Sequence, residues 1–335
     1  MTIQEIINNF VTPSFGDEKK WRQLFVALLA SFIFLIIPIL VAIIFPFIKK
    51  GKLSEKGTVI IYTFSTGFFI TLSLFGFLRE ALEGSTLELN NYNYPDWKVY
   101  VINALIVGGG LSFGISLAFL IKWIIKISAV SKVKKDPHAS QLIHSHDFGE
   151  EHVEHYHIDK HTHTRECEKQ AKSSKRMKAI ALFLLLTHRV PAGLVIGYSL
   201  NSLFDTISKT SSVINLAFLI SFILHLIPEE IIFFYRLKSM GMSNSKSTIL
   251  SISSLLILVP LIIIGIYAGA PLYETKFVKS IVWASVSGIF LFTSIVEFLP
   301  EVLNMKYDKK MVTYILISFF VAIIICSIIL SFHKH

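Results

Sequence analysis

Cysteine is nearly absent from this chain of 335 residues, which contains only Cys167 and Cys326. One lies in a polar stretch and the other in an apolar stretch, so the pair offers no spacing for a disulfide framework or a thiolate metal site. The string H-E-x-x-H, which marks many metal-dependent proteases, does not occur. Residues 1–20 also lack the basic, apolar and small-residue order of a cleaved signal peptide, so the first apolar run is expected to remain in the protein.

Charged residues are scarce as well. They make up 16% of the chain, whereas hydrophobic residues make up 53% and phenylalanine alone occurs 28 times. A mean hydropathy of +0.62 is too high for an ordinary globular domain, and the apolar runs reach the ~20 residues that a membrane span needs. These features predict an all-α integral membrane protein. The formal charge of +9 lies mainly in polar connections, where it sets orientation and meets the lipid bilayer, so nucleic acid is not an expected partner.

Eight apolar runs predict eight transmembrane helices. The expected spans are residues 21–48, 57–78, 99–127, 179–200, 213–236, 248–269, 277–299 and 311–332. An acidic, turn-rich segment is expected after the second span. The predicted organisation is an N-terminal tail at 1–20, helices one to three within 21–127, a histidine-rich loop at 128–178, helices four to eight within 179–332, and a C-terminal tail at 333–335.

Lysine and arginine in the connections predict the orientation. The connections after the first, third, fifth and seventh spans are rich in these residues, and the alternate connections are poorer. The positive-inside rule therefore places the rich connections in the cytoplasm and both termini outside it, as expected for a multi-pass protein of the cell membrane. Lys19, Lys20 and Arg22 argue weakly for the opposite orientation.

The fifth expected span carries an ionisable cluster at its centre. His225, Pro228, Glu229 and Glu230 interrupt a run of more than twenty largely apolar residues, VINLAFLISFILHLIPEEIIFFYR. A charge at that depth costs roughly 2.5 to 3.5 kcal/mol on insertion scales, so such residues usually have a function and face a bundle interior. His225 and Glu229 are four residues apart, on one helical face, and they form half of a divalent-metal site.

The fourth expected span supplies the other half. In the string THRVPAG, His188 and Arg189 precede Pro191, just as His225 precedes Pro228 in LHLIPEE. If the two spans are antiparallel, each histidine lies roughly 15 Å from the cytoplasmic end of its helix at 1.5 Å per residue, so the two share one depth. We therefore expect His188, His225 and Glu229 to form one metal site, with Glu230 as a further candidate ligand.

At these strings, and at VEFLPEV in the seventh span, the chain resembles the ZIP family of divalent metal transporters. The resemblance covers nearly the whole chain. It implies a bundle of eight transmembrane helices with both ends extracytoplasmic, and a long histidine-rich cytoplasmic loop between helices three and four. It also implies metal ligands on helices four and five. The implied function is transport of a bound zinc ion, or else of iron, manganese or cobalt, toward the cytoplasm.

The chain departs from the family's motifs at several positions. Arg189 replaces an asparagine and Ala192 a glutamate in helix four, whereas Leu226 and Glu230 replace a polar residue and a glycine in helix five. A guanidinium has no lone pair for a metal. We expect Arg189 to stand in for a second cation, paired with Glu229 or Glu230. A single-metal transporter and a relative that has lost transport both remain open.

Two further features, one acidic and one rich in histidine, are candidates for contact with the metal ion outside the central site. Glu297 and Glu301 end the seventh span and are expected either on an exit path or at a solvated helix end. The loop is expected to capture metal weakly or to regulate transport, unless it is only a disordered linker. Its candidate ligands are His144, His146, His152, His155, His157, His161 and His163.

Several alternatives accompany this hypothesis. The histidines could be buried hydrogen-bonding residues, and the arginine with its carboxylates could be a structural ion pair. A degenerate metal sensor or scaffold is the main alternative function, and an intramembrane metalloenzyme that activates water is the weaker one. Metal ion and lipid are the expected partners, and a homodimer is a candidate assembly.

Overall fold

The computed structural model describes residues 19–48, 54–133, 189–201, 216–273, 277–303 and 309–331. Every regular element in these ranges is a helix, which confirms the all-α prediction. Six helices of this part of the chain are long and apolar enough to cross a membrane, at 23–46, 56–90, 96–124, 244–268, 278–303 and 309–331. The count of eight spans stays a prediction, because much of the fourth expected span and the start of the fifth lie outside the described residues.

The first half of the chain forms three long rods. Its elements are α3 (Lys19–Ile48), α4 (Glu55–Thr71), the π-helix η2 (Leu72–Leu78), α5 (Arg79–Asn90) and α6 (Asp96–Val133). Ser54 begins α4, because its hydroxyl accepts a hydrogen bond from the amide of Gly57 at 3.2 Å. The second rod runs on through α5 where the sequence predicted a turn-rich segment, since Ala81, Ser85 and Leu89 keep one face buried at helical spacing.

The second half supplies the remaining helices. They are α9 (Arg189–Asn201), α10 (Leu216–Ser239), α11 (Asn244–Leu256), α12 (Leu258–Tyr273), α13 (Val278–Phe292), the π-helix η4 (Thr293–Phe298), α14 (Leu299–Leu303) and α15 (Lys309–Ser331). Ser243 begins α11 by accepting a hydrogen bond from the amide of Lys246 at 3.4 Å. The sixth expected span corresponds to α11 followed by α12, and the seventh corresponds to α13, η4 and α14.

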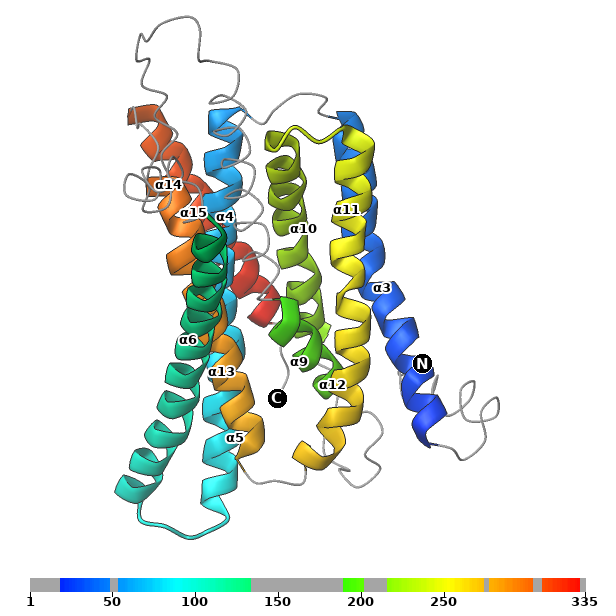
Figure 1. Ribbon diagram of the computed structural model, residues 1–335. Helices are drawn as coiled ribbons and strands as arrows, with labels where there is room; N and C mark the ends of the chain where they lie inside the picture. The colour runs from blue at the N-terminus through cyan, green and yellow to red at the C-terminus, as the bar shows by residue number, and fades with distance from the viewer. Residues whose placement is uncertain are drawn as a thin grey trace, which may run out of the picture.

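The helices form two groups that lie side by side (Figure 1). Helices α3, α9, α10, α11 and α12 pack against one another in the first group, and α4 to α6, α13 to α15 and the two π-helices pack in the second. Helix α10 belongs to the first group through α3 and α11, and it also packs on α4 and α15 of the second. The two groups are therefore joined chiefly along α10.

Glycine allows the closest crossings within each group. A side chain at Gly114 of α6 would meet the carbonyl oxygen of Ser285 on α13 at 1.9 Å, and one at Gly197 of α9 would meet that of Ile262 on α12 at 2.1 Å. Real side chains do not tolerate such distances. Small residues at these crossings let the helix backbones touch, which is how membrane helices gain packing energy without a hydrophobic driving force between them.

The second group contains an internal repeat. Residues 66–80, TGFFITLSLFGFLRE, match residues 287–301, SGIFLFTSIVEFLPE, and each string passes through a π-helix. The two segments are hydrogen-bonded reciprocally. The hydroxyl of Ser73 donates to the carbonyl of Ser287 at 2.8 Å, and that of Ser294, which matches Ser73, donates to the carbonyl of Thr66 at 2.9 Å. The paired contacts indicate a local two-fold relation between the rods.

Aromatic rings follow the same relation. Phe69 and Phe290 occupy matching positions and stack with their centroids 5.1 Å apart. Phe77 packs against Phe290 at 5.0 Å, and the matching pair, Phe298 and Phe69, lies at 5.2 Å. The two-fold relation therefore extends from the serine hydrogen bonds to the aromatic packing.

Candidate metal site

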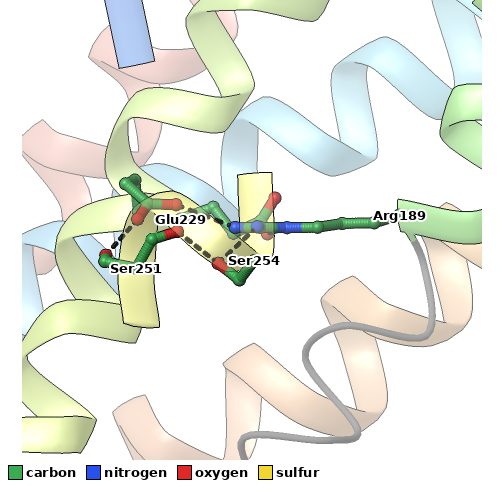
Figure 2. A network of polar contacts seen from close by, with 5 residues as sticks. Arg189, Glu229, Ser251 and Ser254 are labelled. Carbon is green, nitrogen blue, oxygen red and sulfur yellow. Dashed lines mark hydrogen bonds and ion pairs between the residues drawn. The ribbon is translucent and has the colours of Figure 1, made fainter. Parts of the chain in front are cut away.

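Arg189 is the centre of a buried ionic cluster. Its Nε donates to Oε1 of Glu229 at 2.5 Å and its Nη2 donates to Oε2 of Glu230 at 3.0 Å, with all three side chains fully shielded. The guanidinium also lies over the ring of Phe233, 5.6 Å from the centroid. Figure 2 shows the side chain extending from α9 toward α10 and α11. The ion pair expected from the sequence is present, and it engages both carboxylates.

Helix α11 completes the cluster with two serine hydroxyls that the sequence reasoning missed. Arg189 Nη1 donates to Ser254 Oγ at 2.8 Å, and that hydroxyl donates in turn to the carbonyl of Ser251 at 2.6 Å. Ser251 Oγ donates to Oε1 of Glu230. Ser247, Ser251 and Ser254 recur at helical spacing and are buried, a pattern that could have indicated a polar face directed into the bundle.

His225 lies fully buried in an aromatic setting on α10. Its ring packs edge-on against Phe222 at 4.4 Å, Phe69 at 5.3 Å and Phe290 at 5.7 Å between centroids. Because Phe69 and Phe290 are the matching residues of the internal repeat, His225 stands at the interface of its two halves. The structure thus places the histidine where the two helix groups meet.

The cluster has a defined charge balance. One guanidinium faces two carboxylates, so the group holds one surplus negative charge when both glutamates are ionised. Buried charges require compensation, because the interior screens them weakly. In that ionisation state the arginine compensates only one of the two carboxylates. Carboxylate oxygens and imidazole nitrogens are suitable ligands for first-row divalent ions, whereas the arginine can contribute charge only.

The structure brings some of the predicted site residues together and leaves others untested. Arg189, Glu229 and Glu230 meet, and Ala192, at the family's carboxylate position, is fully buried. No group of three histidine, cysteine or acidic side chains able to hold a metal occurs within the described ranges. His188 and the loop histidines at 144–163 lie outside those ranges, so the predicted set His188, His225 and Glu229 remains a prediction.

Glu297 of η4 and Glu301 of α14 lie beside a second arginine. Arg236 of α10 donates from Nη2 to Oε1 of Glu301 at 2.8 Å and from Nε to the hydroxyl of Tyr62 on α4 at 2.7 Å. Glu297 adds negative charge near the same guanidinium. Glu301 is therefore ion-paired and only partly exposed, with 40% of its side chain accessible.

Comparison with protein families gives a match over nearly the whole chain. A family model described as ZIP zinc transporter matches residues 22–330. No curated protein matches the sequence. The matched range covers all of α4 to α15 except the last residue, and nearly all of α3.

Proposed function

Because the chain belongs to the ZIP zinc transporter family, we propose that it carries a divalent first-row metal ion toward the cytoplasm through a site between α9 and α10. Members of this family are transporters of divalent metal ions and not enzymes. Zinc is the expected ion, with iron, manganese or cobalt as alternatives. The observation that supports this location is the carboxylate pair of α10, which is buried against a cation from α9.

His188, His225 and Glu229 are the proposed ligands. His225 and Glu229 lie one turn apart on α10, and Arg189, the neighbour of His188 in the sequence, reaches Glu229 directly. This contact supports the placement of the fourth expected span beside α10. Two imidazoles and one carboxylate are a common set of protein ligands for zinc and leave a position open for exchange.

Arg189 is proposed to occupy the place of a second cation. Its guanidinium bonds to both carboxylates while Ala192 removes a carboxylate from the same helix. A divalent ion that takes Glu229 therefore competes with the arginine, which keeps Glu230 and Ser254 as partners. The site is expected to hold one metal ion, and the tethered charge reduces the affinity so that the ion can leave.

Uptake into liposomes tests the proposal. Purified protein should accumulate radioactive zinc, and side-by-side trials with iron, manganese, cobalt and cadmium give the preference. Glu229→Gln should abolish the uptake because it removes an anionic ligand. Glu83→Gln is the matched control, since Glu83 is a partly exposed carboxylate also paired with an arginine, at 2.7 Å. Absence of uptake for every ion would refute transport.

A sensor or scaffold that does not transport is the second candidate function. One observation favours it, namely that both carboxylates of the cluster are already bonded to Arg189 and that Glu230 also accepts a hydrogen bond from Ser251. Such a protein would bind metal in equilibrium dialysis yet leave the interior of the liposomes unlabelled. The same preparation therefore separates the two functions.

A further inference from the structure

Arg236 of α10 bonds to residues of two other helices at one end of the bundle. It extends from α10, donates to Tyr62 on α4 and to Glu301 on α14, and lies over the Tyr62 ring at 5.5 Å from the centroid. The side chain of Arg236 is only 18% exposed. Charge-assisted hydrogen bonds of 2.7 and 2.8 Å in such a setting are stronger than those between neutral groups. The contact therefore holds α10 firmly against both partners.

This contact joins the two helix groups. Helix α10 packs in the first group, whereas α4 and α14 belong to the second. It lies where α4 begins and where α10 and α14 end, at the upper end of Figure 1. Along α10, Arg236 is three turns, about 16 Å, from His225. The same two helices meet at both levels, because Phe69 of α4 contacts His225 just as Tyr62 contacts Arg236.

We propose that Arg236, Tyr62 and Glu301 form a lock, by which we mean a contact that keeps the interface between α4 and α10 closed at this end of the bundle. A guanidinium can hold the hydroxyl and the carboxylate at once because its donors are arranged as a rigid fork, whereas a lysine ammonium offers a single point of charge. When the lock opens, the first residues uncovered are those on the face of α4 that carries Tyr62 and Phe69.

If the proposed transport function holds, the transported divalent cation can itself open the lock. The carboxylate of Glu301 offers oxygen atoms of the kind that divalent cations bind, and Glu297 adds a second negative charge to the region. An ion that reaches this end competes with Arg236 for Glu301 and thereby loosens the link between the groups. This step rests on the proposed function, but the closing contact itself does not.

Thiol labelling tests the lock without any metal. Ser65 is fully buried and lies on the same face of α4 as Tyr62 and Phe69. In a protein whose Cys167 and Cys326 are replaced by serine, Ser65→Cys therefore reports access of a reagent to the interface between α4 and α10. A membrane-impermeant, positively charged methanethiosulfonate reagent is applied from each side of a vesicle in turn. Arg236→Gln and Glu301→Gln should each raise the labelling rate about tenfold, from one side only.

A control variant and a double variant decide whether the change in labelling comes from the lock. Arg79→Gln breaks an exposed pair of the same chemistry with a bond of 2.7 Å, but within one helix, and should leave labelling unchanged. The double variant of Arg236 and Glu301 should label no faster than Arg236→Gln alone, because that change already removes the bonds to both Tyr62 and Glu301. Unchanged labelling, or an equal rise from both sides, overturns the lock. Metal uptake measured in parallel shows independently whether the transport proposal fails.

Discussion

Arg189 and Glu229 meet at 2.5 Å with both side chains completely shielded from solvent, although they lie on different helices and 40 positions apart in the chain. A buried pair of this kind gains little net stability, because desolvation offsets most of the attraction. Removing one partner is much more costly, since it leaves the other charge uncompensated. The pair therefore makes α9 and α10 dependent on each other.

Replacing the arginine should free ligand capacity. Arg189→Asn combined with Ala192→Glu is expected to raise the metal stoichiometry or affinity of the membrane region, because a carboxylate is gained and a competing cation is lost. Metal content of purified protein lacking the histidine-rich loop, measured by mass spectrometry, gives the result. Arg79→Asn serves as a control at an exposed arginine. Equal stoichiometry and affinity in parent and double variant would show that Arg189 does not occupy a second cation site.

His225 should be needed for metal binding. His225→Ala is expected to reduce metal affinity or transport at least tenfold, or about 1.4 kcal/mol, while the bundle remains folded. His225→Phe is the sharper companion variant, because it keeps an aromatic ring against Phe222, Phe69 and Phe290 but removes both nitrogens. Isothermal titration with zinc measures the affinity. Full affinity in the phenylalanine variant would exclude His225 as a ligand.

Ser251 should contribute to stability through Glu230. Ser251→Ala removes a donor to a buried carboxylate and is expected to destabilise the fold by about 1–3 kcal/mol. Ser253→Ala on the same helix is the matched control, since the Ser253 hydroxyl is exposed and bonds only to the helix carbonyl of Ile249. Thermal unfolding in detergent compares the two variants. Equal melting temperatures would mean that the hydroxyl of Ser251 is dispensable.

Deletion of residues 139–163 should leave basal transport intact. The reference pKa of an imidazole is about 6.5, so a histidine-rich loop of the predicted kind is expected to bind zinc weakly and to release it on acidification. The deletion is expected to remove this pH-dependent binding and to change metal capture or regulation only. Zinc titration at several pH values and liposome uptake together measure both effects. A correctly inserted deletion variant without any uptake would place the loop on the transport route.

The sequence predicts contacts best where one residue type has few acceptable surroundings. An arginine in an apolar span requires a carboxylate, so the pairing of Arg189 with Glu229 or Glu230 was predictable. Ser251 and Ser254 were not identified, because serine is common in membrane helices and its partners depend on helix rotation. The pairing of Glu301 with Arg236 was equally hidden, since the two residues belong to different spans that only tertiary packing brings together.

The internal repeat is symmetrical in its packing and asymmetrical in its chemistry. Tyr62 packs against Phe298 at 6.1 Å, and the matching pair, Trp283 and Phe77, lies at 5.7 Å. An indole offers only a donor, so Trp283 cannot accept a bond from an arginine as the hydroxyl of Tyr62 does. The Tyr62 end of the repeat thus carries a hydroxyl bonded to a charged side chain, whereas the matching position carries an indole packed on Phe77. We therefore expect loss of the Arg236 contact to alter the Tyr62 end of the repeat and to leave the packing around Trp283 unchanged.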